Sequence, residues 1–176
     1  KSVDFRSDLL SGDMALIGKN YGWVRGFSEL SLSGTQHPRE VFNLYNDLII
    51  QSSRVISNLE SISRDAYLNK KYSEALFFRG VSLFYMSVYF SPDGPYDNNY
   101  SIKLDLNDGD ISYYTAADLI NMAIDNLNFS KVLMSISGSE RESKDHINND
   151  VIDSYLAYAF ASIGDWNSVL NHTGSV

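Results

Sequence analysis

Side chains that can act as catalysts are few in this sequence and lie far apart. The three histidines are His37, His146 and His172, and the chain contains no cysteine. Serines and aspartates are numerous, but no Gly-x-Ser-x-Gly elbow places a serine nucleophile in a defined position. We therefore expect no catalytic residues and predict that the protein is not an enzyme. A hydrolase built on two carboxylates is the weakest alternative, because the sequence shows no positioned histidine and no recognisable acid pair.

Metal and nucleotide motifs are equally scarce. The sequence has no His-Glu-x-x-His pair, no Walker loop and no Gly-x-Gly-x-x-Gly turn. Residues 105–110, Asp-Leu-Asn-Asp-Gly-Asp, are rich in the oxygen ligands that calcium prefers, but they lack the downstream glutamate of a calcium loop. A solvated turn stabilised by local Asn and Asp hydrogen bonds is the favoured interpretation. We expect no metal site and no cofactor.

Aromatic residues make up 13% of the chain and include 12 tyrosines. Their flat apolar faces and polar edges suit both sugar rings and protein interfaces. The aromatic residues at helical spacing are expected in the core: Tyr72, Phe77, Phe78, Phe84, Tyr85, Tyr89, Tyr155, Tyr158 and Phe160. Trp166 is expected to pack there too. Aromatic residues outside the helical pattern are the candidates for ligand binding: Tyr21, Trp23, Phe27, Tyr96, Tyr100, Tyr113 and Tyr114.

Composition and charge narrow the class of protein. The 176 residues suit one domain, residues 1–176, and the 44% apolar content is that of a folded chain. The net charge of −8 disfavours a nucleic-acid partner. No apolar stretch reaches the 18 or so residues that span a bilayer, and we expect any targeting signal to lie outside the sequence, which starts at Lys1.

Helical periodicity predicts most of the secondary structure. Apolar residues at alternating spacings of three and four predict a long helix over residues 38–63. Residues 72–90 are apolar nearly all round, which is typical of a helix buried on most sides. We predict further helices from a Thr115 N-cap to Ser137-Gly138, from Val151 to a stop at Gly164, and after an Asp165 cap. Residues 18–34, 96–110 and 137–149 are expected to be irregular or loops.

The helix pattern favours an all-α fold of stacked antiparallel helical hairpins. Small residues such as Gly80, Ala157 and Ala159 would let neighbouring helices approach closely. Tetratricopeptide-type units use this arrangement with about 34 residues per repeat. The sequence shows no strict repeat, only the same helix-turn-helix organisation used twice.

Five segments, which follow the order of the family, give the chain a resemblance to a known family. Residues 72–85, Tyr-Ser-Glu-Ala-Leu-Phe-Phe-Arg-Gly-Val-Ser-Leu-Phe-Tyr, resemble the signature helix of the SusD/RagB family, and residues 90–96 look like its Phe-Gly…Pro turn. Residues 44–49 with Val55-Ile56 are similar to the preceding family helix. Ala117-Asp118-Leu119 and the stretch from Tyr155 to Gly164-Asp165-Trp166 are similar to the helices that follow. Gly80 replaces the family's usual alanine, the turn has a different middle, and family members are much longer, so we expect a fragment of the helical part or a reduced relative.

The resemblance implies a function and a location. SusD-like proteins are non-catalytic lipoproteins of the bacterial outer membrane, exposed at the cell surface, that bind glycan or another nutrient and pair with a SusC-like TonB-dependent transporter. The chain would then touch a membrane only through a lipid anchor outside this sequence. In the family, the loop before the first of these helices often contacts the ligand, and the matching region here contains Tyr21, Trp23, Arg25 and Phe27. Together with the loop residue Tyr96, these are the expected ligand-binding residues. The alternative is a helical-repeat scaffold that binds proteins through a concave groove and does not bind glycans.

Overall fold

The computed structural model describes residues 36–91, 94, 98–106, 109, 111–141 and 143–174. The chain divides into two compact units, residues 1–44 and 45–176. Of the first unit, the described part is residues 36–44, which begin helix α3 (Gln36–Glu60). The helix packing, the strands and the polar clusters described below all lie in the second unit.

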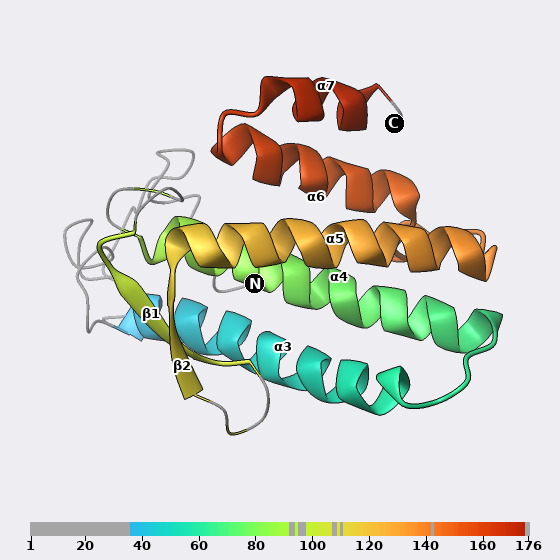
Figure 1. Ribbon diagram of the computed structural model, residues 1–176, viewed down its shortest axis with the longest axis horizontal. Coiled ribbons are helices and arrows are strands. Elements are labelled where there is room, and N and C mark those ends of the chain that lie inside the picture. The colour runs from blue at the N-terminus through green and yellow to red at the C-terminus, as the bar shows by residue number, and fades with distance from the viewer. Residues whose placement is uncertain are drawn as a thin grey trace, which may run out of the picture. The chain divides into compact units, whose positions relative to one another are not determined.

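The described part of the chain is mainly helical, as predicted. After α3 come α4 (Ala66–Tyr89), α5 (Ala116–Ser137), α6 (Asn149–Ser162) and α7 (Trp166–Thr173). From α4 onward, each helix lies beside the next and runs in the opposite direction (Figure 1). None of the described helices is long and apolar enough to cross a membrane.

The helix ends follow from capping residues. The Thr115 side chain and Asp118 form a capping box at the start of α5, and Gly138 ends that helix in the left-handed conformation with φ of 61°. Asp165 caps α7 by accepting a hydrogen bond from the Ser168 N–H, as the sequence predicted. The prediction for α4 was wrong at its start. Asp65 is the N-cap, and its side chain accepts a hydrogen bond from the Leu68 N–H, so the residues from Ala66 to Lys71 are helical too.

Two strands replace part of the predicted loop. β1 (Ser101–Asp105) pairs antiparallel with β2 (Ile111–Thr115), with Lys103 opposite Tyr113. Ile102 and Leu104 are buried while their neighbours Ser101 and Lys103 are exposed, which is the period of two expected of a half-buried strand. The expectation of a loop over residues 96–110 was therefore wrong for β1. The Asp105 carboxylate accepts hydrogen bonds from the Gly109 N–H, in agreement with the turn interpretation of this segment.

The core lies between α4 and its neighbours. One cluster joins α3, α4 and α5 and consists of Ile56, Leu59, Tyr72, Ala75, Leu76 and Leu133. A second cluster joins α4, α5 and α6 and consists of Phe77, Leu127, Met134, Ile152 and Leu156. Small residues bring α4 and α5 together, since a Cβ atom on Gly80 would lie 3.0 Å from Leu127 Cγ and 3.1 Å from the Ala123 carbonyl oxygen. The close approach predicted for Gly80 is confirmed.

Serine side chains complete the same helix contact. Ser73 of α4 and Ser130 of α5 are both fully buried, and each hydroxyl bonds the backbone carbonyl of the other residue, at 2.7 and 2.8 Å. Buried hydroxyls need such partners, because an unpaired polar group in the core costs free energy. The exchange of hydrogen bonds therefore fixes the register of α4 against α5.

Candidate functional site

The five ligand-binding residues expected from the sequence lie outside the described part of the chain. Tyr21, Trp23, Arg25 and Phe27 precede residue 36, and Tyr96 falls in the gap after Gly94. Their assignment stays a prediction. Three of the other loop aromatics are described, and they belong to the β1–β2 hairpin or to its approach.

The exposed side of the hairpin carries an aromatic ring between polar groups. Tyr113 is 69% exposed and lies opposite Lys103, which is also exposed. One position along the ladder on the same side, Asp105 lies opposite the exposed Ile111. We call these four residues the hairpin face. Tyr100, one residue before β1, is exposed as well, whereas Tyr114 pairs with the buried Ile102 on the opposite side.

The hairpin face has the chemistry of a shallow polar-aromatic binding surface. A tyrosine ring can pack against the C–H face of a sugar, and an ammonium group or a carboxylate can hold its hydroxyls. The hairpin backbone holds this ring in place, because Ile102 and Leu104 anchor the other side of β1 in the core. Sequence reasoning had named Tyr113 as a candidate but had missed the strand pairing that places it beside Lys103.

Several helical aromatics are exposed, contrary to the prediction that they belong to the core. Phe78, Tyr89 and Tyr158 each have more than a third of their surface exposed, and so does Trp166. Phe78 and Tyr89 lie on α4, which is apolar nearly all round, yet the neighbouring helices cover only part of its circumference. Tyr158 and Trp166 lie on α6 and α7, and α7 has no buried residue. Tyr72, Phe77 and Phe84 are buried, as predicted.

A stack of three tyrosines lies at the C-terminal end of α4. The ring of Tyr85 stacks on Tyr45 of α3, with centroids 5.2 Å apart, and on Tyr89, with centroids 5.6 Å apart. Burial raises the pKa of Tyr85, and a hydrogen bond with Tyr155 of α6 raises it further. The stack joins three helices, so we assign it a packing role. The spacing of four residues between Tyr85 and Tyr89 is the sequence signal for it.

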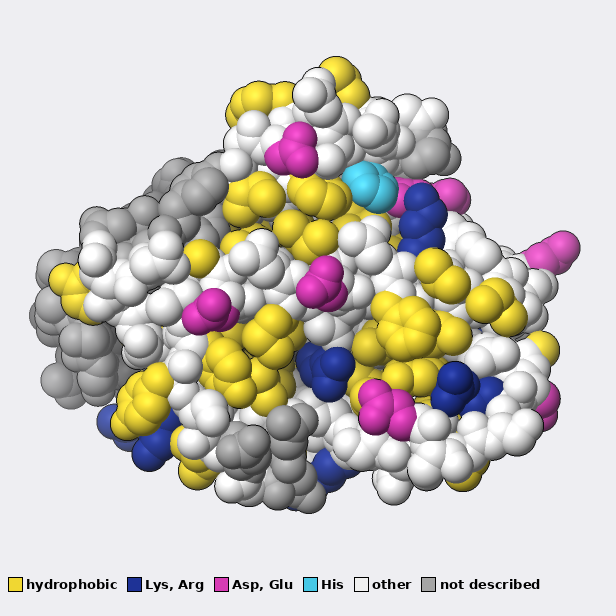
Figure 2. Space-filling view, viewed as in Figure 1, with side chains coloured by type: hydrophobic (Ala, Val, Ile, Leu, Met, Phe, Trp, Pro, Cys, Tyr) yellow, Lys and Arg dark blue, Asp and Glu magenta, His cyan; other side chains and the backbone are white. Residues whose placement is uncertain are grey.

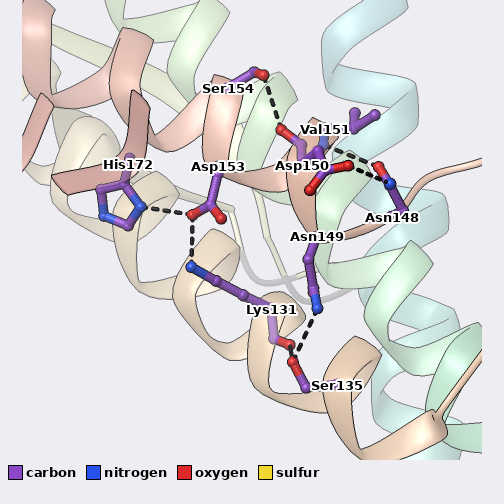
Figure 3. Close-up of polar contacts among 9 residues, drawn as sticks. All are labelled: Lys131, Ser135, Asn148, Asn149, Asp150, Val151, Asp153, Ser154 and His172. Atoms are coloured by element: carbon purple, nitrogen blue, oxygen red, sulfur yellow. Dashed lines mark hydrogen bonds and ion pairs between the residues drawn. The ribbon is translucent and has the colours of Figure 1, made fainter. Parts of the chain in front are cut away.

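A polar cluster joins the last three helices (Figure 3). Asp153 of α6 has only 4% of its side chain exposed, and its Oδ1 atom contacts Lys131 Nζ of α5 at 2.7 Å and His172 Nδ1 of α7 at 2.6 Å. His172 also stacks on the Phe160 ring, with centroids 5.4 Å apart. Burial alone would raise the pKa of Asp153, but the hydrogen bonds and charges of Lys131 and His172 lower it below its ordinary value.

The arrangement of this cluster is that of an ion-pair network. Lys131 and His172 both contact one carboxylate oxygen, which makes the aspartate the shared centre of three helices. Within the described residues, no group of three or more His, Cys, Asp or Glu side chains could hold a metal ion. We interpret the cluster as the contact that fixes α7 to α6 and α5.

Comparisons with known proteins leave the family of the chain open. No protein-family model matches the sequence, and no curated protein matches it significantly.

Proposed function

We propose that the chain is a non-catalytic component of a nutrient-uptake system, which binds glycan or a similar nutrient at the surface of a bacterial outer membrane. In this proposal its helices stack as tetratricopeptide-like antiparallel hairpins, and it pairs with a SusC-like TonB-dependent transporter. The five sequence segments that resemble SusD/RagB proteins support the family, and the helical content agrees with it. The observation that carries ligand binding is the hairpin face.

The hairpin face supports glycan binding through the position of one ring. Tyr113 has 69% of its surface exposed and is fixed by strand pairing opposite Lys103, so a sugar can reach the ring without displacing other residues. An aromatic pair contributes about 0.5–1.5 kcal/mol beyond its buried area, and we expect a sugar face packed on the Tyr113 ring to contribute a similar amount. The contribution converts to up to about tenfold in affinity, which a titration resolves.

The test compares two exposed tyrosines. Native gels containing different polysaccharides, followed by calorimetry with any glycan that retards the protein, measure binding of the wild type and of Tyr113→Ala. Tyr67→Ala is the matched control, because Tyr67 is 64% exposed on α4 and also lies beside a lysine, with Lys71 Nζ 5.6 Å from the ring centroid. We expect weaker binding only in Tyr113→Ala. Equal affinity in the wild type and Tyr113→Ala would remove the hairpin face from the site.

Two companion experiments separate the parts of the proposal. Trp23→Ala tests the site expected from the sequence, and loss of binding there but not in Tyr113→Ala would place the ligand on the residues before α3. Co-purification from detergent-solubilised outer membranes tests the transporter, since a SusC-like partner should be retained by the immobilised chain.

A protein-binding scaffold is the second candidate function, and one surface favours it. Phe129, Val132 and Ile136 form an exposed apolar row along α5, at spacings of three and four residues. Figure 2 shows hydrophobic side chains gathered between α5 and α3, with Lys or Arg side chains among them. An apolar row of this kind is typical of surfaces that bind another chain.

A further inference from the structure

Arg79 lies in the middle of α4 and is directed between α3 and α5. Its Nε atom donates to Asn126 Oδ1 of α5 at 2.7 Å, and its Nη1 atom donates to Ser53 Oγ of α3 at 3.5 Å. Asn126 and Ser53 are both buried, and the arginine itself is half-buried. The guanidinium is therefore held in a fixed orientation between two helices.

The charge of Arg79 has only neutral hydrogen-bond partners. Within the described residues, its guanidinium bonds an amide and a hydroxyl, and no carboxylate lies within ion-pairing distance. The nearby Glu60 is engaged by the Tyr72 hydroxyl at 3.1 Å. Burial lowers the pKa of Arg79, while Tyr72 and Glu60 act in the opposite direction. A partly desolvated cation without a carboxylate partner has lost hydration that no opposite charge replaces.

The guanidinium has donors to spare for an anion. Arginine offers five N–H groups in a planar fork, and the contacts with Asn126 and Ser53 use two of them. A carboxylate matches this fork with two parallel, charge-assisted hydrogen bonds. The net charge of −8 opposes a highly charged anion, so a ligand with a single carboxylate fits better than a polyphosphate.

An exposed apolar row on α5 begins one helical turn from the residue that holds Arg79. Phe129 follows Asn126 by three residues and so lies one turn further along the same helix face. Its ring contacts the Tyr72 ring edge to face, with centroids 5.6 Å apart, and Val132 and Ile136 extend the exposed row beyond it. The exposed row therefore begins one helical turn from Asn126, the α5 residue that holds Arg79.

We propose that Arg79, with Asn126 and Ser53, binds the terminal carboxylate of a peptide whose last side chain is apolar. The carboxylate receives the guanidinium hydrogen bonds, and the apolar side chain packs on Phe129. A uronic-acid sugar offers the same carboxylate but has no apolar group for the row on α5, so the peptide is favoured. The inference does not depend on glycan binding at the hairpin face, because the two sites share no residue.

The experiment observes the donor atoms themselves. The ¹⁵N spectrum of the labelled protein reports Arg79 Nε–H and the Asn126 side-chain amide during titration with acetyl-Gly-Ala-Leu carrying a free carboxylate, and separately with its C-terminal amide. We expect saturable shifts of both signals with the acid form only, and at least tenfold weaker binding to Arg79→Met. Arg141→Met is the control, because Arg141 bonds only the nearby Ser143 and Lys144 carbonyls and takes no part in the proposed site.

Each other outcome contradicts the proposal. Equal shifts with acid and amide would show apolar contact alone, and no shift with either would leave Arg79 a structural link between helices. Saturation by glucuronate but not by the peptide would assign the site to acidic sugars instead. The comparison of acid and amide uses the wild-type protein, so the test remains decisive if Arg79→Met fails to fold.

Discussion

Replacing Asp153 by asparagine tests whether the cluster at its carboxylate fixes α7. The substitution keeps the shape of the side chain but removes the charge that Lys131 and His172 share. A hydrogen bond to a charged group contributes about 1.5–3 kcal/mol, and breaking a fully buried pair costs about 3–5 kcal/mol. Lys131 is 35% exposed and can regain water, and the asparagine oxygen still accepts one bond. We therefore expect a loss of about 2–3 kcal/mol in the free energy of unfolding.

Urea unfolding followed by far-UV circular dichroism measures this loss. Asp150→Asn is the matched control, because Asp150 lies one turn earlier on α6 and is exposed, so it should cost well under 1 kcal/mol. Hydrogen exchange adds a local readout. Amide protons of α7 should exchange faster in Asp153→Asn, while those in the contact between α4 and α5 should lose less protection. A loss no larger than that of Asp150→Asn would refute the reasoning.

Three further predictions concern pH, packing and capping. Because the folded-state pKa of Asp153 lies below its ordinary value, its stabilisation is present above the unfolded pKa of about 3.9 and is lost as pH falls through the folded pKa. The stability difference between wild type and Asp153→Asn should accordingly shrink below about pH 4 in urea titrations at several pH values. Gly80→Val should cost about 1–3 kcal/mol by calorimetry, because its side chain must displace Leu127, and Gly80→Ala should cost less. Thr115→Ala should cost about 1 kcal/mol in urea unfolding, because Thr115 Oγ1 accepts the hydrogen bond of the residue 118 backbone N–H. The cost should fall only in part when Asp118 has already been replaced by alanine, because the backbone bond persists and only the bond between the two side chains is already lost.

Helix positions could be predicted where a cap or a glycine marks the boundary. Thr115 and Gly138 delimit α5 as expected, and Gly164 with Asp165 separates α6 from α7. The start of α4 was missed because Asn69, Lys70 and Lys71 interrupt its apolar pattern, so that the dense apolar run begins only at Tyr72. The hairpin was missed because a strand with two buried side chains gives a short alternation, hidden among Asn and Asp residues.

The functional residues were harder to find for a different reason. Asp153 looks like a surface residue in the sequence. Its position beside Ile152 and four residues before Ala157 puts it on a buried face, and this position is the sequence signal that could have identified it. Arg79 likewise became a candidate only through its hydrogen bonds with Asn126 and Ser53, which are far from it in sequence. Pairings between distant segments of this kind are created by the packing of helices, which local patterns do not encode.

The exposure of Trp166 determines which optical signals can report on this protein. The chain has two tryptophans, and Trp166 is 65% exposed on α7, a helix with no buried residue. Its indole ring is already largely hydrated in the folded state, so its fluorescence emission should shift little when the core unfolds. In a Trp23→Ala background, Trp166 becomes a single fluorophore, and quenching by acrylamide would follow the docking of α7. The core itself is better followed through the absorbance of its tyrosines, since the buried Tyr72 ring lies where α3, α4 and α5 meet.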